Sequence, residues 1–424
     1  MISSRMCLHL LCDKIELKVV FYMNLIYRMI QSTLKLFSKL LPWREPILYQ
    51  GLDDLSNLKS LMLKSGIQKW LIVTDQGLYD AGLVDQLVMD LAQDQIYLYA
   101  SMHVTQNPTI DQIELLYQDY IEFKCEGIIG FGGGSPIDAA KGLGVKVKYP
   151  KHNVSKFKGL LKIHRKLPMI IAIPTTAGTG SEATLAAVLS DPKNKKKYAL
   201  MDIHLIPAVA WLNPSYLAFL PSFYTATTGM DALTHAIEAY VSLGRTKKTD
   251  QRALSAIKTI FDKLILSYEH PRDVSLREDL LIASYDAGFA FTRAYVGNIH
   301  AIAHTFGAFY DIPHGYANAI IMPYVLSYSF DYVKYKLKEI YDYIHPDRTL
   351  KTDEKANWII QHILDMNQKM NIPRHIEIPH LNHLNDMVSH AFKEANPIYP
   401  VRHIYQRKDY KTLIETVSKI KDAN

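Results

Sequence analysis

Short apolar runs alternate with stretches of helical spacing in the first half of the chain. The runs at residues 70–74, 96–99, 127–130 and 169–173 are rich in Ile and Leu, and a helical stretch at 55–64 precedes the first of them. Continuous apolar runs of this kind are typical of parallel strands that helices cover on both faces. The pattern therefore predicts an α/β domain with a parallel sheet that extends to about Ser222.

The second half of the chain has helical spacing throughout. From Phe223 onward apolar residues recur every three or four positions, as in the stripe of Met230, Leu233, Ile237 and Val241. The segments 254–266, 280–289, 299–310 and 358–370 have the same spacing. We expect an all-helical domain over residues 223–424, joined to the α/β domain of residues 44–222 at 214–221, where a proline stands at each end.

Residues 1–43 are apolar and basic, with Asp13 and Glu16 as the acidic residues. The uncharged run at 19–27 is much shorter than the roughly 20 residues that a membrane helix needs. No cleavage site of small residues follows it, which argues against a signal peptide. We predict an N-terminal extension that is either a disordered arm or the product of an upstream start, with Met23 and Met29 as alternative first residues.

Composition narrows the function classes. The chain has 424 residues, a net charge of +6 and three cysteines, at positions 7, 12 and 125. This charge is too small for the length to indicate a nucleic-acid-binding protein, although lysine-rich stretches at 156–166 and 193–197 are either solvated loops or attract a phosphate-bearing ligand. The cysteine spacing fits neither a zinc finger nor a disulfide framework. We therefore expect a reducing cytoplasm, and a metal site, if present, of histidine and carboxylate.

A glycine-rich loop follows the apolar run at 127–130. Residues 130–141 read GFGGGSPIDAAK and lead into a predicted helix. Glycines let backbone N–H groups approach phosphate oxygens closely, and a helix N-terminus adds partial positive charge. Consecutive glycines alone fit a plain tight turn equally well.

Two further features point to a dinucleotide. Asp75 follows the run at 70–74, where a carboxylate can accept hydrogen bonds from ribose hydroxyls and repel a 2′-phosphate. Residues 174–182 read PTTAGTGSE and directly follow another run, so they suit a second ligand-lining loop. Both features would lie at the carboxyl edge of the sheet, where ligands bind in open α/β folds. Of the two, Asp75 favours NAD over NADP.

Histidines gather in the helical half. Asp231 and His235 are four residues apart and share a helix face, which makes half of a site for a divalent cation. His300 and His304 share another face, and the break at 311–313 places His314 at the start of a new helix. Buried histidines without partners are costly, and convergence on one cation accounts for this set.

Together these motifs resemble the iron-containing (group III) alcohol dehydrogenases. The resemblance is carried in order by GGGSPIDAAK, PTTAGTGSE, TGMDALTHAIEAYVS and HAIAHTFGAFYDIPHGYANAI, and it runs from about Pro46 to the C-terminal segment. It implies the fold shared with dehydroquinate synthases: a Rossmann-like α/β domain, a cleft, and an all-α metal-binding domain. Asn213 departs from the pattern, because many relatives have Asp before the proline.

By matching motif positions, the resemblance also implies site residues. The metal, Fe²⁺ or alternatively Zn²⁺, would be held by Asp231, His235, His300 and His314. His304 would be the non-ligand histidine near the nicotinamide, with a catalytic role. The residues lining NAD would be Asp75, Gly132, Gly133, Gly134, Ser135, Asp138, Thr175, Thr176 and Lys197.

The expected reaction is hydride transfer between NAD(H) and a small primary alcohol or aldehyde. One alternative is a polyol or lactaldehyde reductase of the same family. An NAD-using, dehydroquinate-synthase-like lyase is disfavoured because Arg293 is the basic side chain near 300–314, and a non-catalytic relative because all four implied ligands are present. We expect a cytoplasmic homodimer or larger homo-oligomer that acts on small molecules, with neither nucleic acid nor a membrane as partner.

Overall fold

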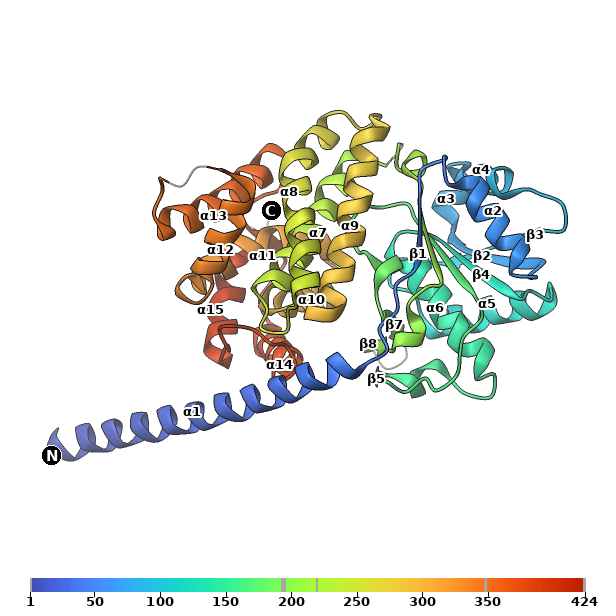
Figure 1. The fold of residues 1–424 in the computed structure, drawn as a ribbon. Coiled ribbons are helices and arrows are strands. Elements are labelled where there is room, and N and C mark those ends of the chain that lie inside the picture. Colours follow the sequence, from blue (N-terminus) through green and yellow to red (C-terminus); the bar gives the residue numbers. More distant parts are fainter. Residues whose placement is uncertain (1, 192–195, 219, 347–348, 422–424) are drawn as a thin grey trace.

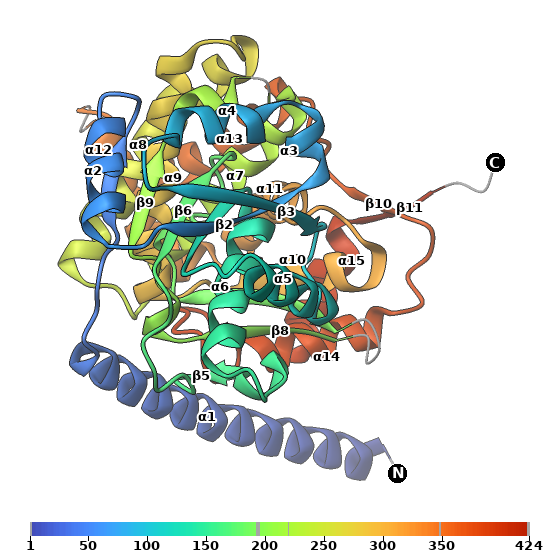
Figure 2. The same ribbon diagram turned by 90° about the vertical axis from the view of Figure 1, so that its right-hand side faces the viewer.

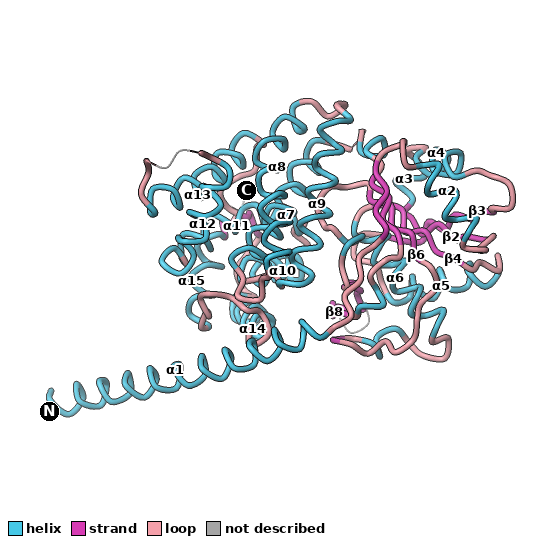
Figure 3. Tube along the Cα trace, in the orientation of Figure 1, coloured by secondary structure: helices cyan, strands magenta, loops and turns pink. Residues whose placement is uncertain are grey.

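The protein has an α/β half and a helical half that lie side by side (Figures 1 and 3). The structure, a computed structural model, describes residues 2–191, 196–218, 220–346 and 349–421. The fold class predicted from the sequence is confirmed. None of the helices in these described ranges combines the length and apolar character that crossing a bilayer requires.

A parallel sheet of six strands forms the centre of the α/β half. Its strands are, in spatial order, β1 (Ile47–Gln50), β9 (Val209–Leu212), β6 (Ile170–Pro174), β4 (Gly127–Gly132), β2 (Lys69–Asp75) and β3 (Tyr97–Val104). The sequence pattern predicted four of them and missed the four-residue strands β1 and β9. A smaller sheet, also not predicted, contains β5 (Gly159–Leu160), β8 (Lys196–Met201) and β7 (Ala186–Asp191).

Helices cover both faces of the six-stranded sheet, because successive side chains of a strand point to opposite faces. Leu71 and Val73 of β2 pack in one core with α5 (Ile110–Glu122) and α6 (Gly134–Lys148). Trp70 and Ile72 pack in the other core, which continues into the helical half. The helices on that side are α2 (Leu55–Lys64), α3 (Gln76–Asp80) and α4 (Leu83–Leu91).

The helical half begins with α7 after the turn at Pro214–Leu217. Its helices are α7 (Ser222–Val241), α8 (Lys247–Glu269), α9 (Val274–Ala294), α10 (Asn298–Tyr310), α11 (His314–Tyr328), α12 (Phe330–Ile344), α13 (Thr352–Lys369), α14 (Leu384–Ala395) and α15 (Arg407–Val417). A short parallel pair, β10 (Ile376–Ile378) and β11 (Ser418–Ile420), accompanies them. The predicted break before His314 is confirmed: α10 ends at Tyr310, and Asp311 has a left-handed φ of 54°.

Residues Ile2–Leu40 form one helix, α1, which runs along one side of the molecule and extends beyond it (Figures 1 and 2). The predicted extension therefore is helical in the structure over these residues. The domain boundaries at 43 and 222 stay predictions, although β9 ends at Leu212 and α7 begins at Ser222.

Candidate metal and nucleotide-binding site

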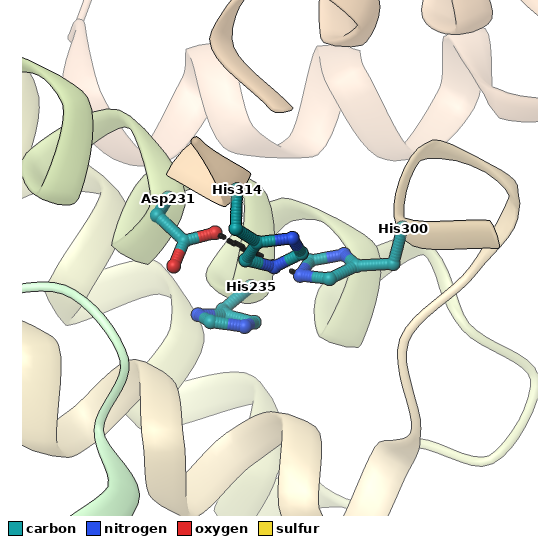
Figure 4. A group of neighbouring side chains, drawn as sticks. All are labelled: Asp231, His235, His300 and His314. Carbon is teal, nitrogen blue, oxygen red and sulfur yellow. Dashed lines mark ion pairs between the residues drawn. The ribbon is translucent and has the colours of Figure 1, made fainter. Parts of the chain in front are cut away.

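Four of the predicted side chains converge in the helical half. One ligand atom from each of Asp231, His235, His300 and His314 lies within 4.8 Å of the others. Figure 4 shows the carboxylate and the three imidazole rings gathered around one point. With metal–ligand bonds of about 2.1 Å, two ligand atoms on opposite sides of a cation lie about 4.2 Å apart, so this spacing is close to that of a single metal site.

Three helices supply these side chains, which explains how residues far apart in the sequence meet. Asp231 and His235 lie one turn apart on α7, His300 lies in the first turn of α10, and His314 begins α11. The backbones of α7 and α11 meet closely, because a Cβ on Gly315 would lie 2.3 Å from the Thr227 carbonyl oxygen. Glycine at 315 is what brings the start of α11 onto α7.

The cluster is largely buried, and this burial favours the neutral form of its histidines. Asp231, His235 and His300 are almost fully buried, while His314 borders solvent. Burial lowers the pKa of His235, and it lowers the pKa of His300 well below its usual value. A neutral imidazole keeps the lone pair that a metal needs, so the environment favours the ligand form of both rings.

The amide of Asn318 shows where the lone pairs point. Its Nδ2 donates to Asp231 Oδ1 at 2.6 Å and lies 3.1 Å from His314 Nε2 and 3.3 Å from His300 Nε2. Three acceptor atoms thus face one donor group, as they would face a cation. One carboxylate and three imidazoles suit Fe²⁺ or Zn²⁺, so the donor set fits the metal that the resemblance implied.

Glu238 orients the His300 ring through Nδ1, on the side that faces away from the cluster. Its carboxylate accepts hydrogen bonds from the backbone N–H groups of Gly297 (2.7 Å) and Ile299 (2.8 Å) and lies 2.6 Å from His300 Nδ1. Burial raises the pKa of Glu238 to about 7, and the N–H donors oppose that rise. The bond to Nδ1 leaves Nε2 of His300 to face the cluster, which is the usual arrangement behind a metal-bound histidine.

His304 lies at the rim of the cluster. Its side chain is 45% exposed, its ring stacks on His314 with centroids 4.9 Å apart, and its Nδ1 lies 2.6 Å from Glu394 Oε1. The same Glu394 oxygen accepts a hydrogen bond from the Tyr399 hydroxyl at 2.9 Å. The structure therefore gives His304 a fixed orientation beside the four converging residues and does not place it among them.

The predicted nucleotide residues gather at the carboxyl edge of the sheet. The strands β6, β4 and β2 are neighbours, so their ends bring Thr175, the glycines after Phe131 and Asp75 together. Asp75 caps α3 through Oδ1, which accepts from the Leu78 N–H at 3.0 Å. Asn107 N–H donates to Ser135 Oγ at 3.3 Å, so Ser135 also faces the loop after β3.

Close packing against the second loop favours glycine at 133 and 134, and the backbone conformation favours it at 132. A Cβ on Gly134 would lie 2.8 Å from Thr179 Cγ2, and one on Gly133 would lie 3.3 Å from Thr176 Oγ1. Gly132 has a φ of 146°, a conformation that favours glycine. The first turn of α6 therefore exposes backbone N–H groups at a position where side chains would collide.

Asp138 and Lys141 hold the second loop from inside. Asp138 accepts hydrogen bonds from Ser181 Oγ at 2.6 Å and from the Val188 N–H at 2.9 Å. Lys141 is fully buried and donates to oxygens of Ser181, Thr184 and Ala186. Both predicted loops are thus fixed to each other by side chains of α6. The side chain of Lys197, in β8, lies outside the described residues.

The second loop also joins the two halves of the molecule. A Cβ on Gly178 would lie 2.5 Å from Thr228 Cβ on α7, and one on Gly180 would lie 2.6 Å from Gly288 Cα on α9. The loop after β6 consequently contacts the glycine turn on one side and the helix of Asp231 on the other. This arrangement places the carboxyl edge of the sheet next to the cluster of Asp231 and the three histidines, which we call the candidate metal cluster.

Sequence reasoning had not identified Asn318, Glu238 and Glu394. Asn318 lies four residues after His314 and Glu238 three after His235, so helical spacing alone places them beside the cluster. Glu394 comes from α14, and no spacing in the sequence connects it to His304. Phe291 of α9 stacks on His235 with ring centroids 4.1 Å apart.

Comparisons with known proteins agree with this arrangement. The family model for iron-containing alcohol dehydrogenase matches residues 46–214, and that for the Fe-containing alcohol dehydrogenase family, C-terminal, matches residues 225–416. The chain is 34% identical to lactaldehyde reductase of Escherichia coli (strain K12), covering 74% of this chain and 82% of that protein. A crystal structure of 1,3-propanediol oxidoreductase has 29% identity and a TM-score of 0.83, covering 88% of this chain and 99% of the other.

A further similarity covers only part of a longer protein. The chain is 39% identical to aldehyde-alcohol dehydrogenase of Streptococcus pneumoniae serotype 4 over 62% of its own length. It spans only 31% of that relative.

Proposed function

Because this chain belongs to the iron-containing alcohol dehydrogenase family, we propose that it transfers a hydride between NAD(H) and a small primary alcohol or aldehyde. The observation that supports the proposal most strongly is the convergence of Asp231, His235, His300 and His314 beside the nucleotide edge. When bound there, Fe²⁺ or Zn²⁺ supplies Lewis-acid polarisation of the substrate oxygen. When bound at the edge, the nicotinamide supplies the hydride chemistry.

The chain's own residues would orient the two reactants. Backbone N–H groups at the start of α6 bind the pyrophosphate, since the helix N-terminus favours negative charge. Asp75 accepts hydrogen bonds from the ribose hydroxyls and repels a 2′-phosphate, which selects NAD. The loop after β6 contacts both sites and would set the distance between nicotinamide and substrate.

His304 would move the proton that accompanies hydride transfer. Glu394 fixes its ring through Nδ1, and the stacking on His314 keeps it at the open side of the cluster. A partly exposed imidazole can exchange protons with solvent near neutral pH. We assign His304 this exchange and leave metal binding to the four converging groups.

A polyol or lactaldehyde reductase is the second candidate, and the similarity to lactaldehyde reductase favours it as a substrate class. The lyase alternative has less support. The guanidinium of Arg293 lies 3.7 Å from the Phe289 ring centroid and 4.8 Å from that of Trp43, so this cation is committed to aromatic contacts.

The test is NADH oxidation by anaerobically purified protein, after metal removal and reloading with Fe²⁺ or Zn²⁺. Acetaldehyde, propanal, glycolaldehyde and lactaldehyde serve as substrates. We expect turnover that depends on metal, with the ranking of substrates separating simple aldehydes from hydroxyaldehydes. Tight NADH binding without turnover on any aldehyde or metal would contradict the proposal.

A further inference from the structure

Helix α1 is attached to the rest of the chain by its polar side. Arg28, Gln31 and Lys35 donate hydrogen bonds from this helix to backbone carbonyls. The acceptors are the carbonyl oxygens of Leu243, Tyr399 and Arg402. Distances of 2.5–2.8 Å join these three pairs, so the C-terminal half of α1 is held at a defined orientation.

The opposite side of α1 is apolar and exposed. We call this surface the α1 outer face. Its large side chains are all at least half exposed. They are Phe21, Tyr22, Leu25, Ile26, Met29, Leu36, Phe37 and Leu40. A surface helix ordinarily turns its apolar residues to the core, whereas α1 exposes these eight, and a contiguous exposed apolar face of this kind marks an interaction site.

Basic residues accompany this face on the same side of the molecule. The chain has no acidic residue between Glu16 and Glu45, nor between Asp138 and Glu182. In the second interval, six basic side chains around β5 are exposed: Lys151, Lys156, Lys158, Lys162, Arg165 and Lys166. Figures 1 and 2 both place β5 on the side of the molecule along which α1 runs. We call these six residues the β5 basic cluster.

We propose that this side of the protein docks on an anionic lipid bilayer, with α1 lying in the interface. Aromatic and aliphatic side chains of the α1 outer face enter the headgroup boundary, and the β5 basic cluster contacts lipid phosphates. An interfacial helix needs an apolar face and basic flanks and does not span the membrane. The described helices contain no candidate span, which agrees with a helix that lies on the surface.

Charge favours a bilayer over a second copy of the chain as the occupant. Parallel pairing of two copies through the α1 outer face would bring two β5 basic clusters toward each other, and like charges repel. Antiparallel pairing would keep the two clusters apart but would not place either against an anionic surface. An anionic surface instead complements the cluster. The proposal departs from the sequence-based expectation of no membrane partner, because that expectation considered only spanning helices and signal peptides.

The experiment is vesicle flotation of the full-length protein. Vesicles of phosphatidylcholine with 30 mol% phosphatidylglycerol are compared with pure phosphatidylcholine at about 0.1 M salt. We expect the bound fraction to be about tenfold higher on anionic vesicles and to fall as salt is raised. Equal binding to both vesicle types, or none, overturns the proposal.

Matched variants separate the two contributions. The triple variant Phe21→Ser, Leu25→Ser and Phe37→Ser should lose about tenfold or more of the binding. The triple variant Ile121→Ser, Met89→Ser and Tyr335→Ser removes equally exposed apolar groups elsewhere and should bind like the parent.

The basic cluster is tested in the same way. The variant Lys156→Gln, Lys162→Gln and Lys166→Gln should lose most binding to anionic vesicles, whereas Lys64→Gln, Lys408→Gln and Lys411→Gln should keep it. Metal-dependent turnover should be unchanged in all four variants. If sedimentation velocity instead shows that serines on the α1 outer face dissociate an oligomer in the absence of lipid, a second copy occupies the face and the proposal fails.

Discussion

The candidate metal cluster and the nucleotide edge differ in the groups that form them: side chains form the first, and backbone forms most of the second. In the cluster, four side chains from three helices converge, and three of them are buried. At the edge, we propose that the backbone of Gly132, Gly133 and Gly134 binds the pyrophosphate, while side chains such as those of Asp138 and Lys141 keep the loops in place. The cluster should therefore fail when a side chain is removed, and the edge when one is added. Four substitutions test this contrast.

The largest effect is expected from His300→Ala. Loss of one of three imidazoles removes the metal and with it several kcal/mol of transition-state stabilisation, which corresponds to a drop in kcat/KM of about a thousandfold or more. Mass spectrometry gives the metal content of the variant, and NADH oxidation gives its activity. The variant His164→Ala, at an exposed histidine, is the control. Retention of metal and full activity would remove His300 from the ligand set.

Glu238→Gln should have the next largest effect. The amide keeps one acceptor oxygen, but its NH₂ end faces N–H donors of Gly297, Ile299 or the His300 ring. Groups that orient a metal ligand typically contribute about 10- to 100-fold to metal affinity. Metal titration against a competing chelator gives the affinity, and Glu339→Gln is a control on α12. An affinity equal to that of the parent would show that His300 needs no such support.

Gly134→Ala tests the edge. The added methyl would lie 2.8 Å from Thr179 Cγ2 and push the second loop away from α6. We expect KM for NADH to rise about tenfold, or about 1.4 kcal/mol, with metal content unchanged. Gly307→Ala is the control, because a Cβ there would meet the Ile312 carbonyl oxygen at an ordinary 3.4 Å. Loss of metal in Gly134→Ala would show that the two sites are not built separately.

Asp75→Ser should have the smallest effect. Without the carboxylate, repulsion of a 2′-phosphate disappears, and the ratio of kcat/KM for NADPH over NADH should rise several-fold. Serine can still cap α3, so stability should be little changed. The control Asp80→Ser removes a carboxylate one turn farther along. An unchanged cofactor ratio would contradict the ribose role of Asp75.

The sequence predicted those parts of the molecule that local spacing determines. Helical periodicity and the four-residue spacing of Asp231 and His235 were enough to predict a helical half with a cation site. Strands β1 and β9, of four residues each, were missed. His300 and His304 have the same spacing, yet one is buried and the other is at the rim. The difference in burial depends on how neighbouring helices pack around the two residues, and the spacing of residues in the sequence does not reveal this packing.

The orientation of α1 is a second feature that sequence periodicity could not predict. Periodicity identifies which side of a helix is apolar, but not whether that side faces the protein. Here hydrogen bonds from Arg28 and Gln31 to a distant segment set the orientation. Those contacts join residues more than 360 positions apart, such as Gln31 and Tyr399 at 368.

The separation of these contacts along the sequence also affects the order in which they can form during synthesis. Synthesis proceeds from the N-terminus, and domains fold in that order. Helix α1 leaves the ribosome before the residues whose carbonyls hold it, because these acceptors lie 208 to 374 positions later in the sequence. During most of translation it has no docking site within its own chain, and a bilayer near the ribosome would meet this helix before any enzyme exists. The nascent chain would then reach the membrane first and fold there afterwards.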